Sequence, residues 1–339
     1  MKHRIFDRTF IIAEIGGNHE GDFNYAKKLL FDAVESGADA VKFQTYKPEK
    51  IVNKVVDLDR YNHFSNFSLN DDQFVELAKI SKDKKIMFMS SVWDKDSLEL
   101  LDPYIEVHKI GSGDMTNYPL IKEIVKKGKP TIISTAMSTL EEISAAVNFI
   151  LSIDSNILNE NRLGIMQCVA MYGEPLDKYA NLNVINTLKH EFPNAIIGYS
   201  DHTLGTHACN VAVGMGAKML EIHFTDDKNR HFRDHHLSVT KDELKMLIED
   251  IRKTENMLGS SLKKPVSDIE TVSRIKEFRR ACYLNKDLNK GNIITEEDLI
   301  TLRPNVGIDA TEYFKILGKR LERKVSKGEP LDWNYFENY

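Results

Sequence analysis

The feature that most constrains the fold of this chain is an alternation of short apolar runs with longer amphipathic segments over its first 260 residues. Eight apolar runs are rich in Ile, Val and Phe and end at glycine or polar residues, as buried strands do. They span residues 10–16, 40–45, 86–92, 107–113, 131–137, 163–170, 195–200 and 219–225.

The segments between these runs have the pattern of amphipathic helices, with Leu, Ile, Val and Ala recurring three and four residues apart. Eight strands that alternate with helices over about 250 residues predict an α/β protein with a (β/α)8 TIM barrel. A doubly wound open sheet shows the same alternation, so the pattern leaves that alternative open. We expect the barrel in residues 1–258, a linker rich in turn residues in 259–275, and a small, mostly β domain in 276–339.

Composition and charge exclude several classes of protein. The net charge of -5 gives no reason to expect nucleic acid or an anionic membrane as a partner. Glu14 interrupts the only apolar run near the N-terminus, so that run does not predict a signal peptide. The three cysteines lie far apart and lack CxxC spacing, which favours a reducing, cytoplasmic location over a disulfide framework.

Polar side chains collect where the predicted strands end, which in a TIM barrel is the end that carries the active site. A buried polar group is costly unless it is used or satisfied, so this pattern predicts an active site. The residues are Asn18, His19, Glu20, Lys42, Gln44, Lys109, Ser112, Asp114, Ser134, Cys168, Tyr172, Ser200, His202, Glu221 and His223.

Two kinds of site are predicted from these residues. Lys109 and the serines at positions 112, 134 and 200 have the chemistry of a phosphate cradle, in which glycines 111 and 113 let the backbone approach an anion. His202 and His223 end adjacent strands, so their imidazoles can converge on one divalent ion and leave positions open for substrate and water. Glu20 and Asp114 are candidate acid/base carboxylates.

The sequence resembles the sialic acid synthase family, that is, the bacterial N-acetylneuraminate synthases and their legionaminic and pseudaminic acid relatives. The resemblance covers nearly the whole chain and lies in the motifs IAEIGGNHEG (12–21), VKFQT (41–45), KIGSGD (109–114), ISTAM (133–137), GYSDHT (198–203) and EIHFT (221–225). Residues 276–339 resemble the antifreeze-like SAF domain of these enzymes, including Arg303-Pro304.

The resemblance implies a condensation of phosphoenolpyruvate with an N-acylated amino-sugar aldehyde, which yields a nine-carbon keto acid and phosphate. It implies that His202 and His223 bind Mn²⁺ or Mg²⁺ and that Glu20 and Asp114 handle protons. The residues implied to hold phosphoenolpyruvate are Lys42, Lys109, Ser112, Ser134 and Ser200. The sugar would contact Gln44, Tyr172 and Asp234, together with Arg303 from the partner subunit of a domain-swapped homodimer.

The sequence departs from the family pattern at three places, of which one is a loop. Asp114 stands where some members have Glu, and Ala170 stands where Asn or Ser often contacts the phosphate. Phe232 and Arg233 precede Asp234 in place of the common GPD sequence. The changes at 170 and 232–233 lie in loops expected to face the sugar, so the acceptor can differ from N-acetylmannosamine.

Three alternatives remain at this point. The acceptor sugar can be 6-phosphorylated or otherwise atypical. A barrel lyase or aldolase could instead use Lys42 or Lys109 in a Schiff base. A carbohydrate-binding module on an inert barrel is the non-enzyme alternative, and it would leave Lys109, His202 and His223 without a use.

Overall fold

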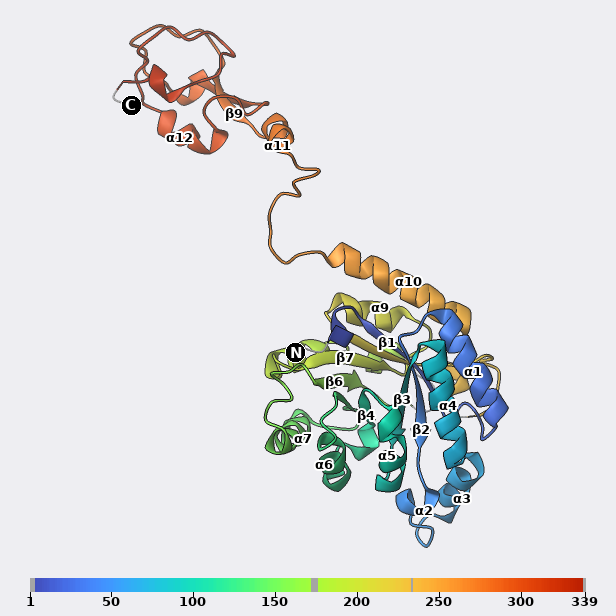
Figure 1. Ribbon diagram of the computed structural model, residues 1–339. Coiled ribbons are helices and arrows are strands. Elements are labelled where there is room, and N and C mark those ends of the chain that lie inside the picture. The colour runs from blue at the N-terminus through green and yellow to red at the C-terminus, as the bar shows by residue number, and fades with distance from the viewer. Residues whose placement is uncertain (1–3, 172–175, 233, 338–339) are drawn as a thin grey trace. The chain divides into compact units, whose positions relative to one another are not determined.

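The computed structural model describes residues 4–171, 176–232 and 234–337, and its first unit is a closed barrel of eight parallel strands (Figure 1). Each strand pairs with the next, and β1 pairs with β8. The predicted TIM barrel is therefore confirmed, and the open sheet is excluded. The strands are β1 (Phe10–Gly16), β2 (Ala40–Thr45), β3 (Met87–Val92), β4 (His108–Ile110), β5 (Thr131–Ser134), β6 (Leu163–Cys168), β7 (Ile196–Asp201) and β8 (Met219–His223).

Helices connect the strands and cover the outside of the barrel (Figure 1). No helix in the described ranges is long and apolar enough to cross a membrane. The helices of this unit are α1 (Phe23–Ser36), α2 (Pro48–Ile51), α3 (Leu58–Phe67), α4 (Asp71–Lys84), α5 (Lys95–Leu101), α6 (Tyr118–Val125), α7 (Leu140–Ile153), α8 (Val184–Glu191), α9 (His207–Gly214) and α10 (Lys241–Leu258).

Local sequence signals set where these helices begin and end. The Asp22 side chain accepts hydrogen bonds from two N–H groups in the first turn of α1, and Gly37, with a φ of 87°, ends that helix in the left-handed region. At the start of α7, Thr139 and Glu142 form a reciprocal capping box. These caps satisfy N–H groups that the helices themselves leave without partners.

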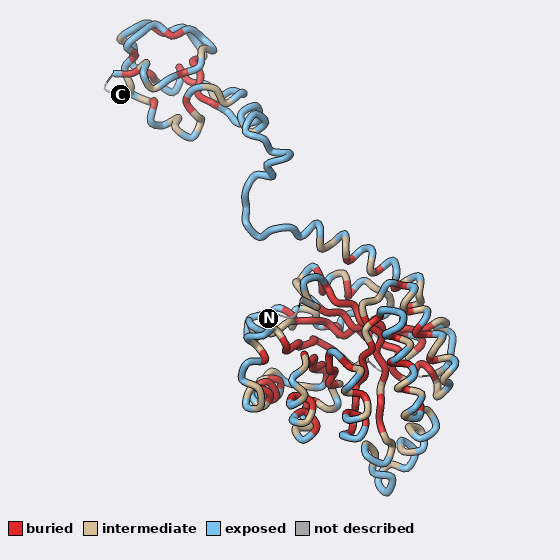
Figure 2. The backbone as a smooth tube through the Cα atoms, in the orientation of Figure 1, coloured by how far each residue is buried: buried red, intermediate tan, exposed pale blue. Residues whose placement is uncertain are grey.

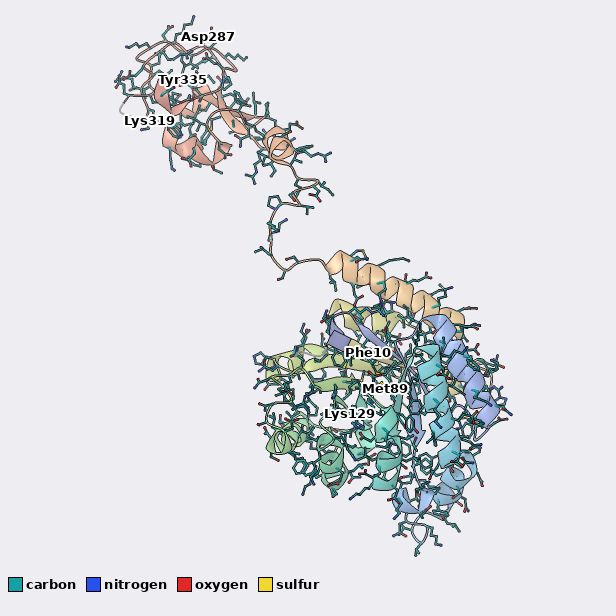
Figure 3. All side chains as sticks on the ribbon, viewed as in Figure 1. Phe10, Met89, Lys129, Asp287, Lys319 and Tyr335 are labelled. Atoms are coloured by element: carbon teal, nitrogen blue, oxygen red, sulfur yellow. The ribbon has the colours of Figure 1, made fainter. Side chains whose placement is uncertain are left out.

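Inside the barrel, the inward-facing side chains change character along the strands. An apolar layer lies toward the N-terminal ends of the strands, and Figure 3 labels two of its members, Phe10 and Met89. Two residues further along, on the same face of each strand, the chain places Glu14, Lys42, Lys109 and Glu221. The apolar layer consists of Phe10, Ile12, Ala40, Met89, Val107, Ile132, Met166 and Met219.

Two glycines make room for the Met219 side chain in this apolar layer. A Cβ atom on Gly198 would lie 2.8 Å from the backbone oxygen of Met219, and one on Gly164 would lie 2.8 Å from the Cε atom of the same methionine. Such distances are too short for carbon atoms, so the absence of side chains on β6 and β7 lets Met219 fill the centre of the barrel.

The second compact unit comprises residues 260–339, after the chain divides at Gly259. Its small antiparallel sheet pairs β9 (Ala281–Leu284) with β10 (Leu299–Leu302), and its helices are α11 (Val272–Phe278) and α12 (Tyr313–Ile316). The segment before α11 is exposed (Figure 2), and α11 begins within the predicted linker. A separate core includes Cys282, Ile316, Leu321 and Phe336.

The fourth strand is much shorter than the apolar pattern predicted. It stops at Ile110, and a 3-10 turn follows at Ser112–Asp114, where the Asp114 N–H donates to the Gly111 carbonyl at 3.0 Å. Ser112 and Asp114 of this turn lie at the C-terminal end of the barrel, where they line a cavity.

Candidate active site

A cavity of about 790 Å³ lies at the C-terminal ends of the strands. That volume lies within the usual range of pockets for small ligands. The structure brings most of the predicted site residues together around it, namely Lys42, Gln44, Lys109, Ser112, Asp114, Ser134, Ser200, His202, His223 and Asp234.

Four buried charged side chains, here called the charged quartet, line this cavity: Glu14, Lys42, Lys109 and Glu221. The Lys42 Nζ atom lies 2.8 Å from Glu14 Oε2 and 3.6 Å from Glu221 Oε2. The Lys109 Nζ atom lies 3.2 Å from Glu221 Oε1, which also accepts a hydrogen bond from the Ser200 hydroxyl at 3.0 Å. The charges alternate in sign, so each one offsets part of the desolvation cost of its neighbours.

The two carboxyl groups of the quartet differ in their affinity for a proton. Burial raises the pKa of Glu14, although Lys42 acts to lower it. Burial also acts to raise the pKa of Glu221, but Lys109 and Lys42 outweigh it and lower that pKa to about 2. Glu14 therefore takes up a proton before Glu221 does, and that proton leaves the quartet with a net positive charge.

The two ammonium groups differ in the same way. Burial lowers the pKa of Lys109, and the charge of Lys42 adds to this effect. Burial acts against the charged form of Lys42 too, but the carboxylates of Glu14 and Glu221 outweigh it and raise the Lys42 pKa.

Serine hydroxyls surround both ammonium groups. Lys109 Nζ donates to Ser134 Oγ at 2.7 Å, and Lys42 Nζ donates to Ser91 Oγ at 3.2 Å. Ser112 Oγ accepts the N–H of Ala136 at 3.0 Å and lies on the cavity wall. Two cations and several hydroxyls at one end of a cavity are the donor groups that an anionic ligand would require.

His202 and His223 lie side by side at the ends of β7 and β8, with 4.7 Å between their ring centroids. His223 Nδ1 lies 3.2 Å from the Asp201 carbonyl oxygen, which can only accept, so Nδ1 carries a proton and Nε2 is the ring nitrogen left to face a ligand. Burial and the neighbouring His223 lower the pKa of His202 to about 3, so its imidazole is neutral.

This pair fits a divalent metal ion that takes its other ligands from substrate and water. The Asp234 carboxylate lies 3.7 Å from His223 Nε2. Among the described residues, no group of three or more His, Cys, Asp or Glu side chains is arranged to hold a metal ion. A divalent ion held by the two imidazoles stays a prediction.

Three other residues on the cavity wall are two that were predicted to belong to the site, Asp114 and Gln44, and one that departs from the family pattern, Ala170. Burial raises the pKa of Asp114, which accepts a hydrogen bond from Asn117 Nδ2 at 3.1 Å. Gln44 Nε2 donates to Glu14 Oε1 at 3.1 Å. Ala170 exposes only a methyl group where a polar side chain could have contacted a ligand.

Comparison with known proteins shows where this architecture belongs. The NeuB family model matches residues 29–263, and the SAF domain model matches residues 279–337. The chain belongs to the NeuB family. The predicted resemblance to sialic acid synthases with a SAF domain is thereby confirmed.

The relatives span nearly the whole NeuB-family chain. It is 39% identical to the N,N'-diacetyllegionaminic acid synthase of Legionella pneumophila over 97% of this chain and 94% of that protein. It is 36% identical to the enzyme of the same name from Campylobacter jejuni over 95% and 98% of the two chains. A crystal structure of N-acetylneuraminic acid (sialic acid) synthetase from Leptospira borgpetersenii, in complex with citrate, matches with a TM-score of 0.73 and 29% identity, over 80% of this chain and 93% of that one.

One predicted residue of this NeuB-family chain, Glu20, is not among the residues that line the cavity. Glu20 points instead to Arg230 and His235, which lie 3.3 and 3.2 Å from its Oε1 atom. Arg303 lies in the C-terminal unit, where its Nε atom donates to a backbone carbonyl of the same unit at 2.6 Å. Tyr172 lies outside the described residues.

Sequence reasoning missed the two carboxylates of the quartet. Glu14 was read only as an interruption of an apolar run, and Glu221 only as one polar residue among many. A stronger signal was available, because each is a charged residue two positions after an inward-facing apolar one, Ile12 or Met219, in the middle of a buried strand. A charge at such a position needs a partner.

The rim of the cavity was also missed. Its aromatic part includes Phe64 on α3 and Trp93 after β3, with Tyr46 stacked on Trp93 at 4.9 Å. Phe67, three residues after Phe64 on α3, packs against Phe232 at 4.3 Å between ring centroids. Helical spacing links only Phe64 with Phe67, because the other rings belong to separate connections between strands and helices.

Proposed function

We propose that this protein condenses phosphoenolpyruvate with an N-acylated amino-sugar aldehyde, giving a nine-carbon sialic-acid-type keto acid and phosphate. The names of its relatives support a synthase of this class. The observation that carries the proposal is the buried pair Lys42 and Lys109, surrounded by serines in a cavity of about 790 Å³. The two legionaminic acid synthases favour a diacetamido hexose as acceptor over N-acetylmannosamine.

The quartet and its serines suit phosphoenolpyruvate, which carries a carboxylate and a phosphate. Lys42 and Lys109 would each face one anionic group, and Ser112, Ser134 and Ser200 would donate hydrogen bonds. A preformed cluster of donors in a site shielded from water stabilises charge that develops as the phosphate leaves.

Proton transfer is the second task of the site. In the proposed reaction, C3 of phosphoenolpyruvate bonds to the aldehyde carbon, water adds at C2, and the C2–O bond to phosphate breaks. The aldehyde oxygen becomes a hydroxyl and the oxygen of the water becomes the keto oxygen, so the two protons of the water end on the new hydroxyl and on the departing phosphate. Glu14, whose pKa is raised by burial, suits the removal of a proton from that water. Asp114, whose pKa burial also raises, suits delivery of a proton to the aldehyde oxygen.

The metal and the sugar complete the proposal. His202 and His223 would hold Mn²⁺ or Mg²⁺, which when bound polarises the aldehyde oxygen as a Lewis acid. Gln44, Asp234 and Tyr172 would face the sugar, joined by Arg303 of the second subunit in a domain-swapped homodimer. A cytoplasmic location is part of the same proposal, and the three cysteines are free.

The test is release of phosphate from phosphoenolpyruvate with a panel of acceptors: N-acetylmannosamine, its 6-phosphate and diacetamido hexoses. We expect release with at least one acceptor, loss of at least 99% of it after chelation, and recovery on adding Mn²⁺. Full activity in metal-free buffer would contradict the metal site. Trapping of pyruvate on the protein by borohydride would contradict the synthase and favour the aldolase.

A further inference from the structure

The loop between β8 and α10, residues 226–238, is fastened to the turn that follows β1. Asn18 Nδ2, in that turn, donates at 3.0 Å both to the Phe224 carbonyl and to Ser238 Oγ, which stand at the two ends of the loop. Ser238 Oγ in turn donates to the backbone oxygen of Asp234 at 2.6 Å. Asn18 therefore fixes where the loop leaves and rejoins the barrel.

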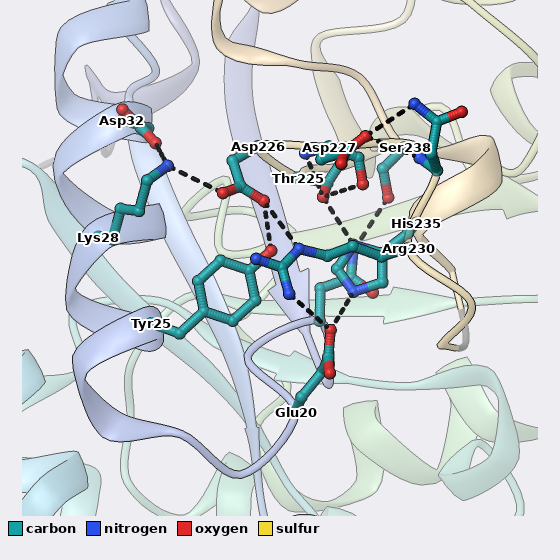
Figure 4. A network of polar contacts seen from close by, with 12 residues as sticks. Glu20, Tyr25, Lys28, Asp32, Thr225, Asp226, Asp227, Arg230, His235 and Ser238 are labelled. Carbon is teal, nitrogen blue, oxygen red and sulfur yellow. Dashed lines mark hydrogen bonds and ion pairs between the residues drawn. The ribbon is translucent and has the colours of Figure 1, made fainter.

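Glu20 of the same turn contacts the middle of the loop (Figure 4). Its Oε1 atom lies 3.3 Å from Arg230 Nη1 and 3.2 Å from His235 Nε2. Arg230 also lies 3.3 Å from Asp226 and stacks over the Tyr25 ring at 4.1 Å. The Glu20 carboxylate, in the turn before α1, therefore contacts the loop at both Arg230 and His235.

The backbone of Glu20 supports this interpretation. Its φ of 54° lies in the left-handed region, which costs free energy for a residue other than glycine. In this conformation the Glu20 side chain lies against Arg230 and His235. Glu20 is not among the residues that line the cavity. Contacts to two cationic or polar groups offset the strain.

His235 links this anchor to the cavity. Its ring is fully buried, its Nδ1 atom lies 2.6 Å from Thr225 Oγ1, and it directly follows Asp234 in the chain. Asp234 lines the cavity, with its carboxylate 3.7 Å from His223 Nε2. We therefore expect a displacement of His235 to shift the neighbouring Asp234, which lines the cavity.

We propose that Glu20 is a positioning residue that acts through His235 and Arg230 to hold Asp234 in place for the acceptor sugar. The part that concerns the sugar rests on the proposed function, whereas the anchoring of the loop does not. Glu20 thereby has a different role from the acid/base role implied by the resemblance.

Hydrogen–deuterium exchange of the full chain tests the anchor without any assay of activity. Glu20→Ala should increase exchange in the peptides that cover residues 226–238 and leave the other strand-end loops unchanged. Lys241→Ala is the matched control, because it also breaks an exposed ion pair to α1, with Glu35 at 2.7 Å, but lies outside the loop. Unchanged exchange in Glu20→Ala would overturn the proposal.

Steady-state kinetics test the positioning role. Glu20→Ala should raise KM for the acceptor by about tenfold and change KM for phosphoenolpyruvate by less than about twofold. Glu20→Gln keeps an oxygen that accepts hydrogen bonds, so its effect should be intermediate. A fall in kcat of about 100-fold or more, equal in the Ala and Gln variants, would assign Glu20 to proton transfer and overturn the proposal.

A double-mutant cycle tests the route through the loop. Because Arg230 and Glu20 act on the same segment, the double variant Glu20→Ala/Arg230→Met should raise the acceptor KM by less than the product of the single effects. Full multiplication of the two effects would contradict a shared route. If the wild-type protein is inert with every acceptor, the proposed function fails, and exchange in residues 226–238 still decides whether Glu20 anchors the loop.

Discussion

The two ends of the barrel interior are built from the same strands, two residues apart, and have opposite chemistry. At the N-terminal ends, side chains such as Ile12 and Met219 form the apolar layer. One step of strand alternation further, Glu14 and Glu221 belong to the charged quartet. The apolar layer, which stabilises the fold, and the charged quartet, which lines the cavity, therefore lie about 7 Å apart along the strands.

The energetics of the two layers differ accordingly. Burial of a large apolar side chain contributes about 1.5–3 kcal/mol to stability. A buried ion pair contributes little in net terms, because desolvation offsets most of the attraction between the charges. The quartet is thus unfavourable for stability alone, and the proposed binding of phosphoenolpyruvate would account for it.

Loss of one cation from the quartet should have the largest effect. Lys109→Met leaves Glu221 with a weaker set of partners, at 3.6 Å from Lys42, so the free energy of unfolding should fall by about 3–5 kcal/mol. Condensation activity should fall below detection, because one of the two ammonium groups for phosphoenolpyruvate is gone. Urea unfolding and phosphate release measure the two effects.

A double variant separates the effect on stability from the effect on activity. Lys109→Met/Glu221→Gln removes both partners of the pair, so much of the lost stability should return while the protein stays inactive. Return of activity together with stability would show that the quartet is structural.

Glu14→Gln should have the next largest effect, on catalysis alone. We expect kcat to fall by about 10²–10⁴-fold and the fold to persist, since the amide oxygen can still accept from Lys42 and the amide N–H can donate to the Gln44 oxygen once the Gln44 amide rotates. A base works in its deprotonated form, and the pKa of Glu14 is raised, so wild-type activity should fall as pH drops through a value above 4.5. That acidic limb should be absent in the variant. An unchanged pH profile would argue against Glu14 as the base.

The apolar layer and the quartet also differ in how far the sequence predicts them. Eight apolar runs were enough to predict eight buried parallel strands, because such strands are apolar on both faces. Closure into a barrel, as opposed to an open sheet, is shown only by the pairing of β1 with β8. The strand-end positions of Lys42, Lys109, His202 and His223 follow from the same pattern. The partners of these residues do not, because they are fixed by how the eight strands are staggered in the closed barrel.

Glu14 and Glu20 show the limit most clearly. Both belong to one short motif, yet the first faces the cavity and the second faces a loop more than 200 residues away in sequence. Strand alternation from Ile12 could have placed Glu14. Nothing in the sequence fixes the direction of Glu20, because it depends on a left-handed turn and on the distant Arg230.

A substitution in the apolar layer should have the smallest effect on activity and a clear effect on stability. Met219→Ala empties the space left by Gly164 and Gly198 at the centre of the barrel, so the free energy of unfolding should fall by about 2–5 kcal/mol. The matched control is Met246→Ala on α10, where the methionine is 64% exposed and the loss should stay below about 0.5 kcal/mol. Urea unfolding followed by Trp93 fluorescence, in a Trp333→Phe background, reports on the barrel alone.

If the two layers are independent, kcat of Met219→Ala should remain within about twofold of the wild-type value under conditions where the protein is folded. A large fall in kcat would instead mean that the apolar layer sets the stagger of β8 and, with it, the distance between Glu221 and the two lysines.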